Sequence, residues 1–380
     1  MHIPFNKPYV SGNEAIHIAS VISKGHLSGN GEYTQKCQKY FEDRYGFGKV
    51  LLTNSCTAAL EMTAILADIK SGDEVIVPSY TYVSTANAFA LRGANIVFAD
   101  SLPNNPNIDP DKIESLITDK TKALVIVHYA GFACNMDKIV AIAKKHNLIL
   151  IEDAAHAIES KYKDKYLGTY GDMATFSFHE TKNIITGEGG MLAINNKKLY
   201  ERAEIIWEKG TNRASFNRGE VPCYQWIDIG SSFLPSDLTA AFLFGQLEII
   251  DRIQQKRIKL FNYYYDSLID IANKYSFKLP DIPEFSTKNG HIFYIVLPSN
   301  KVRTKLSDYL KSKNVHALFH YLCLHQSPYY QAANPNAEEL KNSQMFTSCL
   351  LRLPMFYSLT YDEIDYVVEN IYTFFSEINK

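Results

Sequence analysis

The chain has 380 residues, of which 46% are hydrophobic and 21% are charged, and its 39 Lys and Arg residues nearly balance its 41 Asp and Glu residues. This composition excludes disordered and collagen-like proteins, and the length suggests two domains or one large domain with an appendage. The formal net charge of -2 gives no long-range field for binding nucleic acid or an anionic membrane, so any anionic ligand must be held by a local site.

The start of the chain and its cysteines favour a cytoplasmic protein. Residues 1–8 lack the charged, apolar and small-residue succession of a secretory signal, and no uncharged apolar run reaches the roughly 18 residues that span a bilayer. The six cysteines are scattered and include no C-x-x-C pair. We therefore expect free thiols rather than disulfides, and no structural zinc site.

Short apolar runs between residues 48 and 200 predict the strands of a parallel or mostly parallel α/β sheet. Their apolarity is continuous rather than alternating, which is typical of strands buried on both faces. The runs lie at 50–52, 74–78, 94–99, 123–127 and 148–151. Because ligands bind beyond the carboxyl ends of such strands, the residues that follow each run are candidates for a functional site.

The C-terminal part of the sequence predicts a second, smaller domain. A helical pattern at 238–264 carries the chain out of the first domain, and the prolines at 280–283 mark a break. The elements expected beyond the break are strands at 292–297 and 315–319 and helices at 304–312 and 362–376. We place the boundary near residue 246, which gives domains 1–246 and 247–380.

A polar stretch after the first predicted strand has the features of a phosphate site. Ser55, Cys56 and Thr57 open a predicted helix directly after the run at 50–52. Backbone N–H groups at a helix N-terminus, with hydroxyls beside them, bind phosphate without any net positive charge. The same pattern is also that of an ordinary Ser or Thr N-cap. Tyr82, which follows the next strand, could cover a flat cofactor ring or could only pack against its neighbours.

An acidic residue and a lysine follow two other strand candidates. Asp153 comes just after the run at 148–151, and Lys182 lies between an apolar run and the glycine-rich turn at 186–190. A pyridoxal phosphate (PLP) enzyme needs an acid to pair with the pyridinium nitrogen and a lysine to bind the cofactor as a Schiff base. Partial desolvation would make this lysine nucleophilic at neutral pH. Helix capping by Asp153 and a solvated loop lysine are the alternative interpretations.

Four motifs in this order resemble the PLP-dependent nucleotide-sugar aminotransferases of the DegT/DnrJ/EryC1/StrS family, and the likeness runs nearly end to end. The motifs lie at 54–60, 78–85, 152–156 and 177–183. Within that family, three further segments most resemble the dTDP-4-amino-4,6-dideoxyhexose transaminases. These segments are 128–131, 208–213 and 228–232.

The resemblance implies an aspartate-aminotransferase-like (fold type I) large domain, a smaller C-terminal α/β domain, and a homodimer with its sites at the subunit interface. Lys182 would bind PLP covalently, Asp153 would pair with the pyridine nitrogen, and Tyr82 would stack on the ring. The remaining cofactor contacts would be Cys56, Thr57 and Ser177 at the phosphate, His156 near the phenolic oxygen, and Ser232 at the phosphate of the partner subunit. Many relatives have Gln in place of His156 and Asn in place of Ser232.

The resemblance also implies a reaction. L-Glutamate would give its amino group to C4 of a dTDP-4-keto-6-deoxyhexose and leave as 2-oxoglutarate. The product would be a dTDP-4-amino-4,6-dideoxyhexose, of galactose or glucose configuration, for a surface polysaccharide such as the O-antigen of lipopolysaccharide. Candidate substrate contacts are Lys209, Asn212, Arg213, His320, Tyr321 and His325. Arg213 could bind the pyrophosphate bidentately or could form a surface ion pair.

Several other functions compete with this prediction. The nearest are a 3-aminotransferase acting on a dTDP-3-keto-6-deoxyhexose, a non-catalytic regulatory homologue, and a sugar dehydratase with His at the lysine position, against which Lys182 argues. Metal hydrolysis would use Asp153, His156, His128 and His179, although no H-E-x-x-H spacing supports it. A serine hydrolase would need a G-x-S-x-G elbow, which the sequence lacks.

Overall fold

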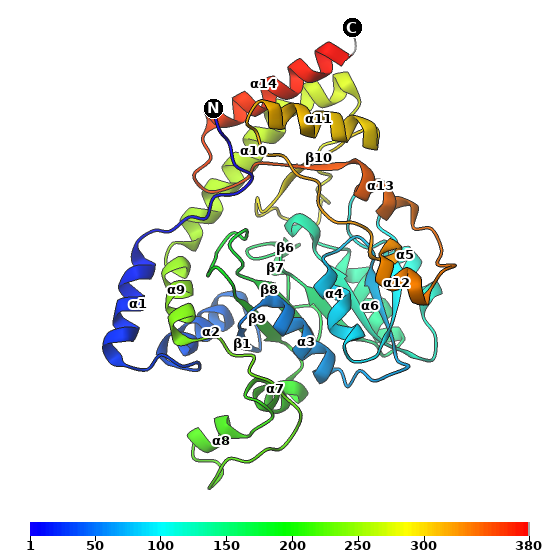
Figure 1. The fold of residues 1–380 in the computed structure, drawn as a ribbon. Coiled ribbons are helices and arrows are strands. Elements are labelled where there is room, and N and C mark those ends of the chain that lie inside the picture. Colours follow the sequence, from blue (N-terminus) through cyan, green and yellow to red (C-terminus); the bar gives the residue numbers. More distant parts are fainter. Residues whose placement is uncertain (379–380) are drawn as a thin grey trace.

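A seven-stranded sheet lies at the centre of the larger part of the molecule (Figure 1). The computed structural model describes residues 1–378. The strand order is β1-β9-β8-β5-β4-β2-β3, with β9 antiparallel to both neighbours and the other pairs parallel, which confirms the expected mostly parallel α/β sheet. The strands are β1 (Lys49–Thr53), β2 (Glu74–Pro78), β3 (Asn95–Ala99), β4 (Thr121–Val127), β5 (Ile149–Asp153), β8 (Met173–Ser177) and β9 (Gly190–Ile194).

Helices cover both faces of this sheet. Successive residues of a strand point to opposite faces, so Leu124 packs on one side while Ala123 and Val125 pack on the other. The helices on the first side are α2 (Glu32–Tyr45), α6 (Met136–Lys145) and α9 (Asp237–Leu247), with α1 (Asn13–Lys24) along α9. Those on the second side are α3 (Cys56–Leu66), α4 (Val83–Ala90) and α7 (Tyr200–Trp207).

The helix expected at 238–264 is in fact two helices, so that prediction was wrong. Helix α9 ends at Leu247, and α10 (Ile250–Tyr275) begins after Ile249, whose φ of -122° and ψ of 12° are not helical. The break has a packing cause, because α9 is buried against the large sheet while the middle of α10 contributes to a second hydrophobic core.

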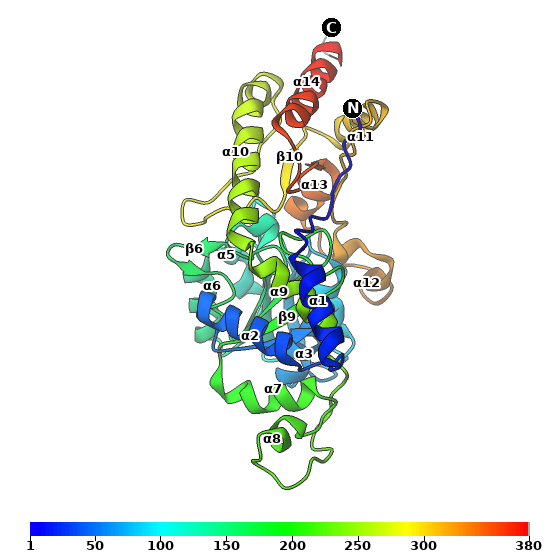
Figure 2. The same ribbon diagram turned by 90° about the vertical axis from the view of Figure 1, so that its left-hand side faces the viewer.

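The second core lies between α10 and the C-terminal helices, as the side view in Figure 2 shows. The elements around it are α11 (Asn300–Ser312), α13 (Lys341–Cys349), α14 (Tyr361–Ile378) and an antiparallel pair of strands, β10 (Phe293–Val296) and β11 (Leu350–Leu353). Ile3 is also fully buried in this core. The boundary proposed at residue 246 lies beside the break between α9 and α10. Through Ile3, the start of the chain also packs on the second core.

Residues 315–319, expected as a strand, form only isolated bridges. Val315 pairs with Ile3 and Leu318 pairs with Arg352. Because residues 314–316 bond to Ile3 while Leu318 bonds to Arg352, the segment has no continuous ladder with one partner strand, and this prediction was also wrong. The remaining elements are α5 (Pro110–Ile113), α8 (Arg213–Asn217), α12 (Pro328–Ala333), β6 (Lys161–Tyr162) and β7 (Lys165–Tyr166).

Two further properties concern the whole chain. The six cysteines are free thiols. Across the described residues 1–378, the structure contains no helix with the length and apolarity needed to cross a membrane.

Candidate active site

A cavity of about 550 Å³ opens at the carboxyl edge of the parallel strands, between the large sheet and the smaller domain. This volume is in the range of small-molecule sites. The cavity is lined by the N-terminus of α3, the end of β5, the loop between β8 and β9, and residues of the smaller domain. The predicted site residues that line it are Cys56, Thr57, Tyr82, Asp153, His156, Ser177, Lys182, His320 and Tyr321.

Asp153 ends β5, and its buried carboxylate lines the cavity. Its Oδ2 accepts a hydrogen bond from the Thr85 hydroxyl at 2.7 Å, and its Oδ1 accepts one from the Ala155 N–H at 3.1 Å. Burial raises the pKa of Asp153, although these hydrogen bonds and the charge of Lys182 act in the opposite direction. A carboxylate offers about four acceptor positions, so this one retains capacity for a cationic partner.

Lys182 lies in the loop between β8 and β9, and its backbone N–H donates to the His179 carbonyl at 2.9 Å. Burial lowers the pKa of Lys182 to about 8; the charge of Arg352 adds to this, while Cys56 and Asp153 act against it. An amine with this pKa is partly neutral near physiological pH, so it is suited to act as a nucleophile and as a proton acceptor.

Aromatic and histidine side chains form the wall next to Lys182. The Ala130 N–H donates to His156 Nδ1 at 3.3 Å, so in the neutral ring Nε2 carries the proton and donates to the Tyr321 hydroxyl at 3.2 Å. Burial, with the charges of Lys182 and Arg352, holds the pKa of His156 well below its ordinary value. The imidazole is therefore neutral and fixed in one tautomer.

Several predicted residues belong to a segment that projects beyond α7 and do not line the cavity of this chain (Figure 1). They are Lys209, Asn212, Arg213 and Ser232. The Arg213 Nε lies 3.8 Å from the carboxylate of Glu208, which is the ion pair considered as an alternative for this residue. The carbonyl of Ser232 accepts a hydrogen bond from the Asn54 side chain at 3.3 Å, which places this residue near the start of α3.

His325 is also separate from the cavity, whereas three unpredicted residues belong to the site. His325 is buried, with Nδ1 2.6 Å from the Ser79 hydroxyl. His291 and Arg352 line the cavity, and Thr85 orients Asp153 from behind. The sequence feature that could have indicated Arg352 is a single arginine within the otherwise apolar residues of β11. No comparable feature marks His291 or Thr85 as a site residue.

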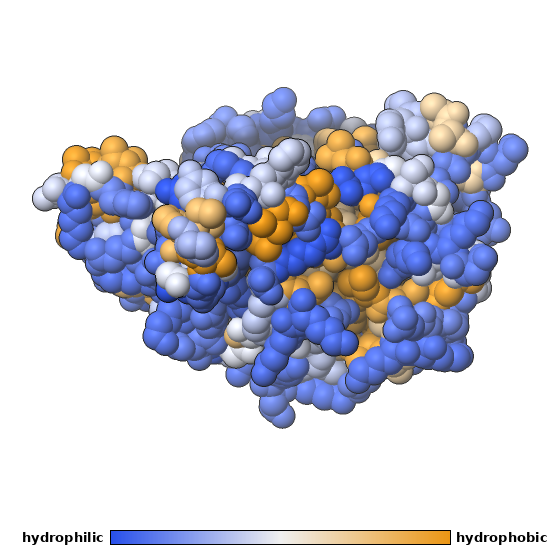
Figure 3. Space-filling model, turned by 90° about the horizontal axis from the view of Figure 1, so that it is seen from below, coloured by the Kyte–Doolittle hydropathy of each residue, from blue (hydrophilic) through white to orange (hydrophobic). Residues whose placement is uncertain are grey.

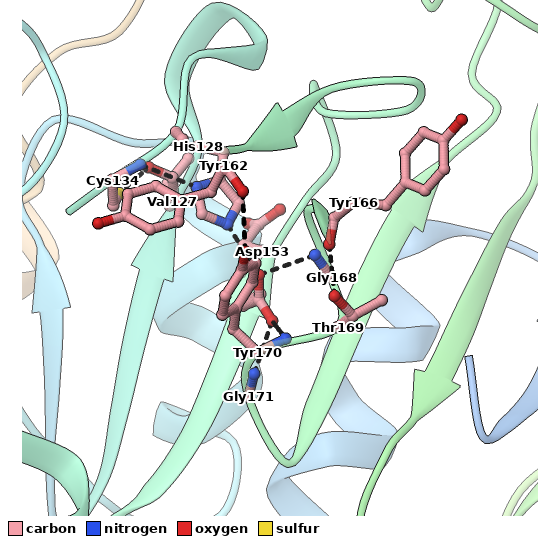
Figure 4. Close-up of polar contacts among 12 residues, drawn as sticks. Val127, His128, Cys134, Asp153, Tyr162, Tyr166, Gly168, Thr169, Tyr170 and Gly171 are labelled. Carbon is pink, nitrogen blue, oxygen red and sulfur yellow. Dashed lines mark hydrogen bonds and ion pairs between the residues drawn. The ribbon is translucent and has the colours of Figure 1, made fainter. Parts of the chain in front are cut away.

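Glu152, which precedes Asp153 in β5, is buried and forms a hydrogen-bond network that fixes the end of the strand; Figure 4 labels its partners His128, Gly168, Tyr170 and Gly171. Its Oε1 accepts the N–H groups of Tyr170 and Gly171, each at 2.7 Å. Its Oε2 accepts the Gly168 N–H at 2.8 Å and lies 3.0 Å from His128 Nε2. Burial raises the pKa of Glu152, but His128 and these backbone donors outweigh it, so the net pKa is lowered.

Glu152→Gln should lower the free energy of unfolding by about 3 kcal/mol, because the amide places a donor against N–H groups in a buried site. The pKa of Glu152 is lower in the folded protein than its ordinary 4.5. The stabilisation is therefore complete above that pH and is lost as the pH falls through the folded-state pKa. Urea denaturation across this range measures it. Glu248→Gln, at a surface carboxylate bonded to His17, is the control, and an equal loss in both variants would contradict the prediction.

The comparison with known families decides the identity of this site. A family model described as the DegT/DnrJ/EryC1/StrS aminotransferase family matches residues 9–372. The chain belongs to this family.

Individual relatives agree over the full length. The spore coat polysaccharide biosynthesis protein SpsC of Bacillus subtilis is 32% identical, covering 97% of this chain and 96% of its own. The GDP-perosamine synthase of Escherichia coli O157:H7 is 33% identical, covering 99% of each chain. A solved structure described as the PLP form of the putative sugar aminotransferase Spr1654 from Streptococcus pneumoniae has the same fold, with a TM-score of 0.91 at 23% identity and full coverage of both chains.

As a member of the DegT/DnrJ/EryC1/StrS family, the chain is a sugar aminotransferase of fold type I and uses PLP, which confirms the predicted class, fold and cofactor. The cavity fits this cofactor. Cys56 and Thr57, the first residues of α3, line its wall together with Ser177. The Ser55 side chain caps the helix by accepting the Ala58 N–H at 3.0 Å, and the N–H groups of Cys56 and Thr57 have no partner within the helix. Asp153 would supply the acid that a pyridinium nitrogen requires, and Lys182 would supply the amine that a Schiff base requires.

Gly190→Ala should weaken PLP binding, because a Cβ at this position would fill the space beneath the start of α3. That carbon would lie 2.5 Å from the Cys56 nitrogen and 2.6 Å from the Ser55 carbonyl carbon, which are backbone atoms that cannot rotate away. Overpacking of this kind costs about 1–3 kcal/mol, and here it displaces the first turn of α3 from the cavity. Titration of the apoenzyme with PLP measures the effect.

Gly245→Ala is the matched control for this substitution. Its added carbon would lie 2.7 Å from the Glu14 nitrogen, a comparable approach to backbone, but Gly245 lies on α9 and does not line the cavity. Equal PLP affinities for the two variants would show that the close approach of β9 to α3 does not support the cofactor.

Proposed function

We propose that this aminotransferase transfers the amino group of L-glutamate to C4 of a dTDP-4-keto-6-deoxyhexose, giving a dTDP-4-amino-4,6-dideoxyhexose for a surface polysaccharide. The observation that carries the proposal is that Lys182 and Asp153 line one cavity together with Cys56 and Thr57, the first residues of α3. The resemblance of the segments 128–131, 208–213 and 228–232 to 4-amino-sugar transaminases supports the position on the sugar. The six free thiols suit a reducing compartment, and we place the reaction in the cytoplasm.

In this proposal each residue has one task. Bound PLP supplies a ring that draws electrons from the substrate carbon attached to the reacting nitrogen. Asp153 keeps the ring nitrogen protonated, and Thr85 holds the carboxylate in place. The Lys182 amine takes the proton from the α-carbon of glutamate and returns a proton when the sugar is aminated. Tyr82 covers the ring, and the neutral His156 stands beside the phenolic oxygen.

We further propose that two copies of the chain assemble, with each segment 209–232 reaching the site of the other copy. This segment exposes large apolar side chains, including Trp226 at 82% and Ile227 at 53% exposure. Figure 3 shows hydrophobic patches on this end of the molecule. Such patches are typical of protein interfaces. Ser232, Lys209, Asn212 and Arg213, which do not line the cavity of their own chain, would then contact the partner's ligands.

The proposal is tested by mixing the enzyme, PLP and L-glutamate with dTDP-4-keto-6-deoxyglucose and identifying the product. A 4-amino sugar is expected, and its C4 configuration distinguishes the galactose from the glucose product. A GDP-4-keto-6-deoxyhexose is the second arm, because one relative is named as a GDP-perosamine synthase. Amination of the GDP sugar alone would reject the dTDP assignment, and amination only of a 3-keto isomer would reject the assignment to C4.

Two of the competing functions have their own tests. Conversion of glutamate to 2-oxoglutarate in a single turnover would exclude a regulatory homologue. Within the described residues, no group of at least three His, Cys, Asp or Glu side chains could hold a metal ion, and this includes Asp153, His156, His128 and His179.

A further inference from the structure

His291 is a buried histidine that lines the cavity, and the hydrogen bonds around it fix its tautomer. Its Nδ1 lies 3.0 Å from Asn183 Oδ1. The Asn183 Nδ2 donates to the Asn289 backbone carbonyl at 3.0 Å and to Gln254 Oε1 at 3.1 Å. Because a backbone carbonyl can only accept, the Asn183 atom next to it is the nitrogen, and the atom next to His291 is the oxygen. His291 therefore donates from Nδ1, and Nε2 of the neutral ring is an acceptor.

This acceptor is unused and firmly placed. Within the described residues, His291 Nε2 has no hydrogen-bond partner. The backbone that carries the ring is held by its own bonds, since the His291 N–H donates to Asn289 Oδ1 at 3.0 Å and Arg257 donates to the carbonyls of Gly290 and His291 at 3.0 and 2.9 Å. By contrast, the neighbouring His156 is hydrogen-bonded at both ring nitrogens.

The amine of Lys182 has the complementary property. It lines the same cavity, and within the part of the chain that the structure describes its Nζ has no hydrogen-bond partner. A desolvated ammonium without an acceptor is costly. We propose that His291 positions the free Lys182 amine by accepting a hydrogen bond from it at Nε2. This inference rests on the proposed function, in which Lys182 carries the proton, and it adds the group that holds the amine while it does so.

The other ionisable groups that act on Lys182 are poorer acceptors. They are Cys56 from α3, Asp153 from β5 and Arg352 from β11. Burial raises the pKa of the Cys56 thiol, and a neutral thiol is a weak acceptor. Arg352 has no acceptor atom, and Asp153 is committed to the ring nitrogen of the cofactor in the proposed function. His291 is left as the neutral acceptor.

The bond to Asn183 favours Lys182 over a substrate hydroxyl as the donor. Asn183 is the next residue in the chain after Lys182, so one loop holds both the amine and the imidazole. Burial lowers the pKa of His291 far below its ordinary value, and His156, Lys182, Arg257 and His320 add to this lowering. The ring can therefore accept a hydrogen bond from the ammonium without taking its proton.

The test is the pH dependence of Lys182 acetylation by trace acetic anhydride in the apoenzyme, followed by peptide mapping, because only the neutral amine reacts. His291→Asn keeps a donor for Asn183 at the place of Nδ1 and removes the acceptor at Nε2. Since the ammonium loses an acceptor, the midpoint should fall about one pH unit below that of the wild type, as expected for a lost charge-assisted hydrogen bond. In His291→Gln the amide oxygen can occupy the place of Nε2, so the midpoint should stay near the wild-type value.

A second measurement is the glutamate half-reaction of the PLP-loaded enzyme. In His291→Asn the limiting rate should fall about 10-fold, because the amine is less well placed, while the glutamate concentration for half-saturation stays unchanged. The control is His17→Asn, at a histidine whose Nδ1 lies 3.1 Å from the Tyr33 hydroxyl and which does not line the cavity. It should leave both measurements as in the wild type.

The outcomes that overturn the inference are distinct. A wild-type midpoint in His291→Asn would overturn it, and a fall in His291→Gln alone would show that the ring only holds Asn183. Equal falls in both variants would attribute the effect to lost packing. An unchanged midpoint with a raised half-saturation concentration for the keto sugar would assign Nε2 to a sugar hydroxyl. Acetylation needs no substrate, so a wild-type enzyme that fails to react with glutamate would refute the proposed function separately.

Discussion

Lys182→Ala is expected to abolish turnover, with a loss of at least about 10⁴-fold in kcat, because one amine serves as the covalent anchor of the cofactor and as the acid and base. No neighbouring group can replace it. His156 is neutral and hydrogen-bonded at both ring nitrogens, and burial raises the pKa of the Cys56 thiol. Steady-state assay with glutamate and the keto sugar measures the loss. Borohydride reduction followed by peptide mapping should label Lys182 in the wild type and leave no label in the variant.

The control is Lys198→Ala, at an exposed lysine of the same domain, which should keep wild-type activity. A small primary amine added to Lys182→Ala should restore part of the activity, because it can carry the proton that the side chain carried. Substantial turnover by Lys182→Ala without added amine would refute the assigned role.

The same amine sets an expected pH dependence. Burial lowers the pKa of Lys182 to about 8, so the neutral, proton-accepting form is depleted as the pH falls below that value. The rate constant for Schiff-base formation between the apoenzyme and PLP should therefore decline on the acid side with a midpoint near this pKa. A rate that does not change between pH 6 and 8, in ~0.1 M salt, would contradict a nucleophilic amine with this pKa.

The parts of this structure that were predictable are those decided by local pattern. The apolar runs became β2 to β5 because continuous apolarity suits strands buried on both faces. Asp153 could be placed at a functional edge in advance because ligands bind beyond the carboxyl ends of parallel strands, whereas Ser177 was expected only from the family resemblance. Lys182 follows from the same edge, since its loop connects β8 to β9.

The parts that could not be predicted depend on contacts between distant segments. Arg352 reaches the cavity only because β11 pairs with β10 beside the large domain. His325 follows the predicted strand region at 315–319, yet Ser79 draws its ring into a buried hydrogen bond. Whether Ser232 reaches a partner's phosphate depends on a second copy of the chain, which a pattern within one chain does not specify.

Asp153→Asn is expected to lower kcat by about 10²- to 10³-fold, the usual effect of removing a preorganised charge from a reaction centre. The amide has nearly the same shape as the carboxylate but cannot hold a protonated ring nitrogen by charge. The ring would then lose its proton and with it much of its ability to draw electrons from the substrate carbon. Since Asp153 does not contact the donor in this proposal, the KM for glutamate should change far less than kcat.

Asp172→Asn provides the matched control for this substitution. Asp172 accepts hydrogen bonds from the Leu150 N–H at 3.0 Å and from Asn196 at 2.9 Å, so it supports the other end of the same strand without lining the cavity. Its amide variant should lower the melting temperature while keeping kcat. Thr85→Val, which removes the donor at 2.7 Å from Asp153, should reduce kcat less than Asp153→Asn does. If Asp153→Asn retained most of the wild-type kcat, the carboxylate would have only a structural role, as the acceptor for the Ala155 N–H after β5.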